Sequence, residues 1–169
     1  HDTGMFSPND GQLDFYSNNV KVLSAYQNAG LTLEHGAVIR DSSDDAISFG
    51  QESGTDGNQG TKAVALGFGT GNLNQGYLST AVGPNAAREN QGHSSVAVGH
   101  AAAEYNQGTD AVAVGVGAGK NSQGNYAVAL GERAGYGDSS PQGQYSVAIG
   151  SGAGYSSQAA HSIAINASG

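Results

Sequence analysis

The sequence of 169 residues contains no cysteine and no tryptophan. Without cysteine the chain has no disulfide framework, no thiolate zinc site and no thiol nucleophile. Basic residues are scarce as well, because six Lys and Arg stand against fourteen Asp and Glu, for a formal net charge of -8. Phosphate-backbone binding needs clustered Lys and Arg, so we exclude nucleic acid as a main partner. No apolar run approaches the roughly 20 residues of a membrane-spanning helix, so we expect no membrane insertion.

Glycine, in contrast, is abundant, with 28 positions, and it marks an internal repeat. A glycine closes each short block of small and aliphatic residues, and the spacings between these glycines are 17, 16, 16, 16, 16 and 19 residues. The marker positions are Gly50, Gly67, Gly83, Gly99, Gly115, Gly131 and Gly150. A Gln-Gly pair recurs in the same phase, for example at Gln91 and Gly92. Two independent markers in one phase indicate a true repeat of about 16 residues.

Within each block, aliphatic residues alternate with Ala or Ser, as in Ser95-Val96-Ala97-Val98-Gly99. A period of two is typical of a β-strand with two different faces. The glycine after the strand and the later Gln-Gly pair provide two bends per repeat. The sequence therefore predicts an all-β fold, a β-roll or β-solenoid of about 16 residues per turn, with equivalent positions stacked turn upon turn.

Such a coil is thin, and we expect it to need a partner. We predict that the Val, Ile and Leu face fills the coil, while the small residues allow close approach of another copy about a symmetry axis. The predicted seam residues are Ala65, Ala81, Ala97, Ala113, Ala129 and Ala148. The assignment of the two faces remains open at this stage, and replacing Ala113 by Leu is the test of the seam.

The repeat carries a family resemblance. Ser95-Val96-Ala97-Val98-Gly99 and Ser146-Val147-Ala148-Ile149-Gly150 resemble the head repeat of YadA-type trimeric autotransporter adhesins. This resemblance implies a left-handed parallel β-roll assembled as a homotrimer. The unit here is longer than the usual unit of that family, and the longer form is similar to repeats in tail fibres of bacteriophages and large algal viruses.

Two flanking segments also resemble viral fibres. They are Asp2-Thr3-Gly4-Met5-Phe6-Ser7-Pro8 with the following Gln12 to Phe15, and the stretch from Ser162 to Gly169, which resembles the exit from such repeats. In those fibres the exit commonly precedes a trimerisation chaperone. Because the chain starts at His1 and stops after Asn166 to Gly169 without a closing element, we interpret it as a piece of a longer chain.

Residues 1–43 lack the repeat, and we assign them to an N-terminal β element or connector that leads into a repeat domain at residues 44–169. Short strands are expected at Gln12 to Tyr16, Val20 to Leu23 and Leu31 to Leu33, separated by turn residues. The acidic segment Asp41 to Asp45 is expected to be a solvated connecting loop, because it lacks the spacing of a calcium loop.

We find no catalytic motif and expect no enzyme activity, no cofactor and no metal site. Gly115 to Asn121 only resembles a phosphate-binding loop, because small residues recur there in every repeat. Glu89 and Glu104 lie 15 residues apart, so neighbouring turns can bring them close, but we interpret them as solvated. The histidines occupy different repeat positions, so we interpret them as scattered surface residues.

Because no catalytic motif is found, we expect the function of the chain to lie on its outer surface. Exposed tyrosines offer rigid contact area with one polar tip, and one repeat carries three extra residues near Gly135 to Pro141, where insertions project as loops. The candidate receptor-binding residues are Tyr105, Tyr136, Asp138, Ser139 and Tyr155. The competing interpretations are that the tyrosines only shield the bends and that the three extra residues are merely a tolerated insertion.

We therefore predict a segment of a trimeric extracellular fibre, a viral tail fibre on the virion, that attaches to a host-surface glycan or protein receptor. The alternatives are the head of a bacterial trimeric autotransporter adhesin on the bacterial outer surface, a polysaccharide-degrading tailspike, and a passive fibre shaft. A loss of viscosity when a polysaccharide is mixed with the protein would support the tailspike. An absence of binding both to glycan arrays and to host cells would favour the passive shaft.

Overall fold

The structure is a computed structural model that describes residues 4–6, 12–17, 20–26, 30–33, 38–41, 45–55 and 59–166. The predicted domain boundary at residues 43 and 44 and the centre of the acidic segment lie outside these ranges. The described residues contain no helix, and therefore none that is long and apolar enough to cross a membrane.

Antiparallel strands come first along the chain. Each of the strands β1 to β5 pairs with the next, and β5 pairs antiparallel with β6, so β5 does not belong to the parallel stack. They overlap the three strands expected there. The bounds are β1 (Gly4–Phe6), β2 (Gln12–Ser17), β3 (Val20–Tyr26), β4 (Gly30–Leu33), β5 (Val38–Asp41) and β6 (Ile47–Phe49).

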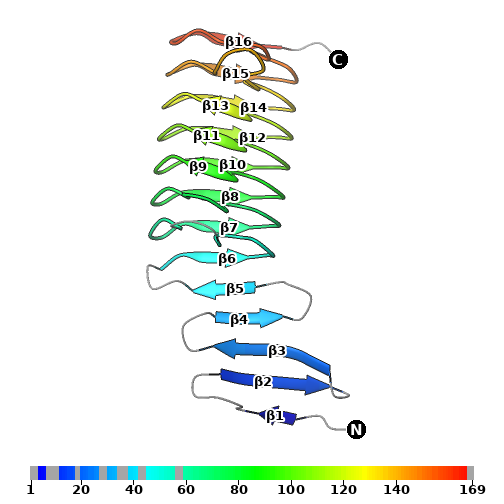
Figure 1. Ribbon diagram of the computed structural model, residues 1–169. Helices are drawn as coiled ribbons and strands as arrows, with labels where there is room; N and C mark the ends of the chain where they lie inside the picture. The colour runs from blue at the N-terminus through cyan, green and yellow to red at the C-terminus, as the bar shows by residue number, and fades with distance from the viewer. Residues whose placement is uncertain are drawn as a thin grey trace.

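From β6 onward the strands are parallel and stack along one axis (Figure 1). They pair in strict register with the equivalent residue of the next repeat, as Val96 does with Val112. These strands are β7 (Val64–Leu66), β8 (Thr80–Val82), β10 (Val96–Val98), β12 (Val112–Val114), β14 (Val128–Leu130), β15 (Val147–Ile149) and β16 (Ile163–Ile165). A second, shorter sheet contains β9 (Glu89–Gln91), β11 (Tyr105–Gln107) and β13 (Asn121–Gln123). The predicted β-solenoid of about 16 residues per turn is confirmed, with about seven turns.

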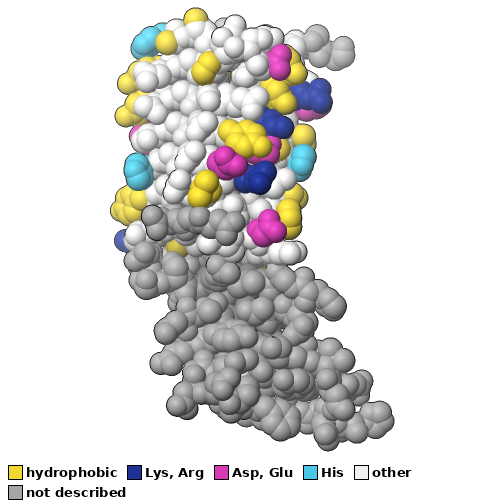
Figure 2. Space-filling model, in the orientation of Figure 1, with side chains coloured by type: hydrophobic (Ala, Val, Ile, Leu, Met, Phe, Trp, Pro, Cys, Tyr) yellow, Lys and Arg dark blue, Asp and Glu magenta, His cyan; other side chains and the backbone are white. Residues whose placement is uncertain are grey.

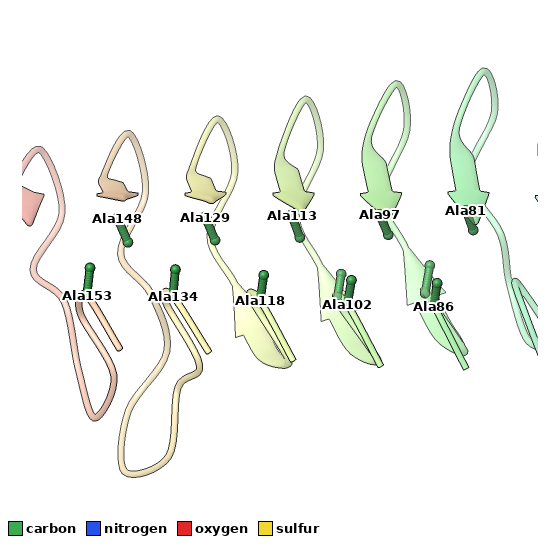
Figure 3. Close-up of a cluster of buried hydrophobic side chains, with 12 residues drawn as sticks. Ala81, Ala86, Ala97, Ala102, Ala113, Ala118, Ala129, Ala134, Ala148 and Ala153 are labelled. Carbon is green, nitrogen blue, oxygen red and sulfur yellow. The ribbon is translucent and has the colours of Figure 1, made fainter. Parts of the chain in front are cut away.

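The alanine face of the strands fills the coil, which corrects our assignment of the faces. Ala97 and Ala113 are fully buried, and their side chains point toward Ala102 and Ala118 on the opposite bend (Figure 3). The aliphatic residues between them point outward, and Val114 is 37% exposed. The physical reason is the narrow cross-section, because a Cβ added at Gly119 on the opposite wall would lie 3.3 Å from the Ala113 Cβ. Only small side chains fit between these two walls, and the columns hold Ala with an occasional Ser or Thr, such as Ser48 and Thr70.

The same burial overturns the predicted seam. All six seam candidates have 0% exposure in the single chain, so a partner chain cannot reach them. They are Ala65, Ala81, Ala97, Ala113, Ala129 and Ala148. A contact between copies along this sheet would therefore use the aliphatic face.

A column of buried glutamines completes the interior. The Gln107 Nε2 donates to the Oε1 of Gln123 and to the backbone oxygen of Val96, at 3.1 and 2.9 Å. The same amide-to-amide bond, also at 3.1 Å, links the neighbouring members of the column from Gln91 to Gln158. Each amide thus ties its own turn to the next and also donates to a backbone oxygen of the parallel sheet.

Glycine at the end of each strand allows neighbouring turns to approach closely. Gly99 has a φ of 127°, a conformation that side-chain-bearing residues rarely adopt. A Cβ at this position would lie 2.7 Å from the backbone oxygen of Gly115 in the next turn. The repeating glycine is therefore a requirement of both backbone conformation and stacking distance.

Candidate functional site

The candidate site is built from one repeat position on the bend before the second sheet. Arg88, Glu104, Lys120, Tyr136 and Tyr155 occupy this position in five successive turns. Because the strands stack in register, their side chains form one column along the solenoid. In Figure 2, charged and hydrophobic side chains lie side by side on the right of the described part.

The charged side chains of this column are followed by its aromatic rings, and neighbouring members are in close contact. The Lys120 Nζ lies 3.1 Å from the Glu104 Oε2 and 5.7 Å from the ring centroid of Tyr136. The rings of Tyr136 and Tyr155 are stacked, with centroids 5.0 Å apart and planes 9° apart. Lys120 therefore binds a carboxylate on one side and an aromatic face on the other.

Glu104 controls the protonation of its neighbours. Its hydrogen bond to Lys120 raises the pKa of that ammonium group, against the effect of burial. Its hydrogen bond to Tyr105, together with burial, raises the pKa of the phenol. Glu104 itself is buried, which corrects our expectation that it is solvated.

The three extra residues form a loop beside the stacked tyrosines, as predicted. The backbone nitrogens of Gly137 and Asp138 donate to the backbone oxygen of Tyr155, and those of Ser139 and Ser140 donate to that of Ser156. The loop is thus held against the next turn, while the side chains of residues 138–141 are exposed. The insertion does not disturb the sheet, because Val128 still pairs with Val147.

The structure brings the five candidate receptor-binding residues to one side of the solenoid. We define the tyrosine patch as Glu104, Tyr105, Lys120, Tyr136 and Tyr155 together with residues 137–141. Sequence reasoning missed Glu104 and Lys120 as members of this patch. Counting positions within the repeat identifies both, because they share the register of Tyr136 and Tyr155.

A second aromatic column lies at the opposite bend. The rings of Tyr126 and Tyr145 stack at 4.9 Å, and His161 stacks on Tyr145 at the same distance. His161 is therefore part of a column rather than an isolated surface residue. The same counting shows this, because Tyr126, Tyr145 and His161 share one repeat position.

The site holds hydrogen-bonding groups, one ammonium group and aromatic rings, a set suited to binding. Within the described ranges, no group of three or more His, Cys, Asp or Glu side chains is arranged to hold a metal ion.

Comparisons of the chain with models of protein families, with curated proteins and with solved structures find no match. The resemblance to trimeric adhesin heads therefore rests on the sequence motifs alone.

Proposed function

We propose that this chain is a segment of a homotrimeric extracellular fibre, a viral tail fibre, that attaches to a host surface without catalysis. The observation that carries the proposal is the outward aliphatic face of the parallel sheet. Two columns of Val, Ile and Leu run along it, and Leu66, Val114 and Ile149 are each more than a third exposed. Contiguous apolar patches of this kind mark interaction surfaces.

A copy of the same chain is the partner that fits this face. Its side chains repeat at the spacing of stacked strands, about 4.8 Å. Only a surface with the same repeat matches it at every turn, and a second solenoid in register has that repeat. Contacts of this kind close into a ring when the rotation between copies closes. When three copies meet with these faces around one axis, the aliphatic columns of each copy are buried.

Sedimentation equilibrium tests the assembly. We expect a species of three times the 16.8 kDa of the chain. Val114→Lys places a charge in the buried seam and should give monomers. Val116→Lys is the matched control, because Val116 is also exposed and lies on the bend beside the same strand. A monomeric unsubstituted chain would refute the assembly, and a trimer of the Val114→Lys variant would refute this seam.

The tyrosine patch is the proposed receptor contact, present three times per fibre. Three copies raise avidity above the affinity of one site when several engage together. Host-cell binding of the trimer should decrease in the Tyr136→Ala and Asp138→Ala variants. It should persist in the Tyr126→Ala variant, which changes the second aromatic column. Equal binding by all three variants would exclude the patch, and no binding by the unsubstituted trimer would indicate a passive shaft.

A further inference from the structure

A hollow outside the tyrosine patch spans two successive turns of the solenoid. It has a volume of about 310 Å³ and is lined by Asn74, Gln75, Gly76, Asn90, Gln91 and His93. Asn74 and Asn90 occupy one repeat position, and Gln75 and Gln91 occupy the next. This volume is at the lower end of the roughly 300–1,000 Å³ of ligand pockets, and the hollow is open to solvent, so it has room for no more than one ring.

The walls of the hollow are set by hydrogen bonds between the turns. The Asn74 Nδ2 donates to the Asn90 Oδ1 at 3.0 Å, and the Asn90 Nδ2 donates to the Asn106 Oδ1 at 3.1 Å. The backbone nitrogen of Tyr77 donates to the His93 Nδ1 at 3.1 Å. In neutral His93 the proton is therefore on Nε2, which is a donor available to a ligand. The side chains are held in place before a ligand arrives, which lowers the entropic cost of binding.

The buried glutamine column is interrupted at this hollow. Gln75 and Gln91 are both more than nine-tenths buried, and the Oε1 atom of each has no hydrogen-bond partner. The Oε1 of Gln123, in contrast, accepts from Gln107. Both Oε1 atoms are shielded from solvent, and that of Gln75 faces the inner wall of the coil at Gly71, so neither reaches a ligand in the hollow. The groups that a ligand can contact are the exposed side chains of Asn74, Asn90 and His93.

The chemistry of the lining selects the ligand. None of the six lining residues is Asp, Glu, Lys or Arg, and the chain carries a net charge of -8, which disfavours anions. Amide groups and an imidazole offer donors and acceptors in the mixture that neighbouring hydroxyl groups require. We propose that this hollow binds a neutral sugar ring, a single hexose unit of a glycan, independently of the tyrosine patch.

Nuclear magnetic resonance of the full 169-residue chain tests the site, with methyl glycosides of glucose, galactose and mannose as neutral probes. We expect at least one glycoside to shift the side-chain amide signals of Asn74 and Asn90. Neither inorganic phosphate nor N-acetylneuraminic acid should do so. Asn74→Ala and His93→Ala should each weaken binding by about tenfold through the loss of one hydrogen bond.

Two matched controls separate the hollow from general effects. Asn125→Ala removes a side chain that accepts from the Thr109 backbone nitrogen, as His93 accepts from that of Tyr77, but Asn125 does not line the hollow. His100→Ala removes an exposed histidine elsewhere. Both variants should bind the glycoside as the unsubstituted chain does. The proposal is overturned if no neutral glycoside shifts the two amides, if the anions shift them as strongly, or if His93→Ala and Asn125→Ala lose binding equally. Unchanged thermal unfolding of each variant shows that loss of binding is local.

Discussion

The inward and outward faces of strand β12 differ in side-chain size, in the reverse of the usual order. Ala113 faces the interior and is fully buried, whereas Val112 and Val114 face outward. In most proteins the larger apolar side chain is the buried one. Here the walls on either side of the alanine columns are too close for a large aliphatic side chain, so these residues are left outside. The solenoid therefore has an apolar exterior because its interior beside the strands has no volume for Val, Ile or Leu.

The strongest test of this comparison is a leucine on each face of the same strand. Ala113→Leu adds three carbons between walls already in contact and should destabilise the chain by about 3 kcal/mol or more. Val114→Leu adds one carbon on the outer face, where no wall of the same coil lies opposite, and should cost about 1 kcal/mol or less even where the seam covers it. Urea denaturation of the two variants measures the difference. A stable Ala113→Leu variant would contradict the assignment of the alanine face to the interior.

The glutamine column allows a second comparison, between an intact and an interrupted part of the interior. Gln107→Leu removes amide bonds to both neighbouring glutamines and leaves buried partners unsatisfied, at a cost of about 1–3 kcal/mol. Gln75→Leu loses a single bond, to the Val64 oxygen, and also removes an unpartnered Oε1. We expect the smaller loss for Gln75→Leu in the same denaturation experiment. Equal losses would show that the amide ladder does not stabilise the stack.

The smallest expected effect concerns Glu104, a buried charge outside the coil. The pKa values of Lys120 and Tyr105 are raised above their ordinary 10.5 and 10.0, chiefly by hydrogen bonds to Glu104. The folded chain therefore holds both protons more tightly than the unfolded chain. This stabilisation is complete below about pH 10 and is lost as the pH rises through the raised pKa values.

Unfolding between pH 9 and 12 measures this contribution, where both groups titrate. Glu104→Gln should flatten the alkaline decrease in stability. Glu132→Gln should keep that decrease, because Glu132 is exposed and lies 3.9 Å from its partner Arg133. The same alkaline slope in both variants would mean that Glu104 does not hold the two protons.

Much of the architecture could be predicted because it repeats. The strand at Val96–Val98, the bend at Gly99 and the extra loop before Gln142 all follow from spacing and from the conformational freedom of glycine. The tyrosines of the patch could also be named. The pairing of Lys120 with Glu104 was missed, because contacts across turns become visible only when residues are compared at the same repeat position.

The sequence by itself determined the turn length, the alternation and the positions of the bends, since these depend on local backbone geometry and on a period that can be counted. Only the tertiary structure decided which face lies inside, because alternation shows that two faces differ but not how far apart the walls stand. The distance between opposite walls depends on how the two bends of each turn close. At Ala113 that distance leaves room for a methyl group, and the valines on either side are consequently available for contact with other molecules.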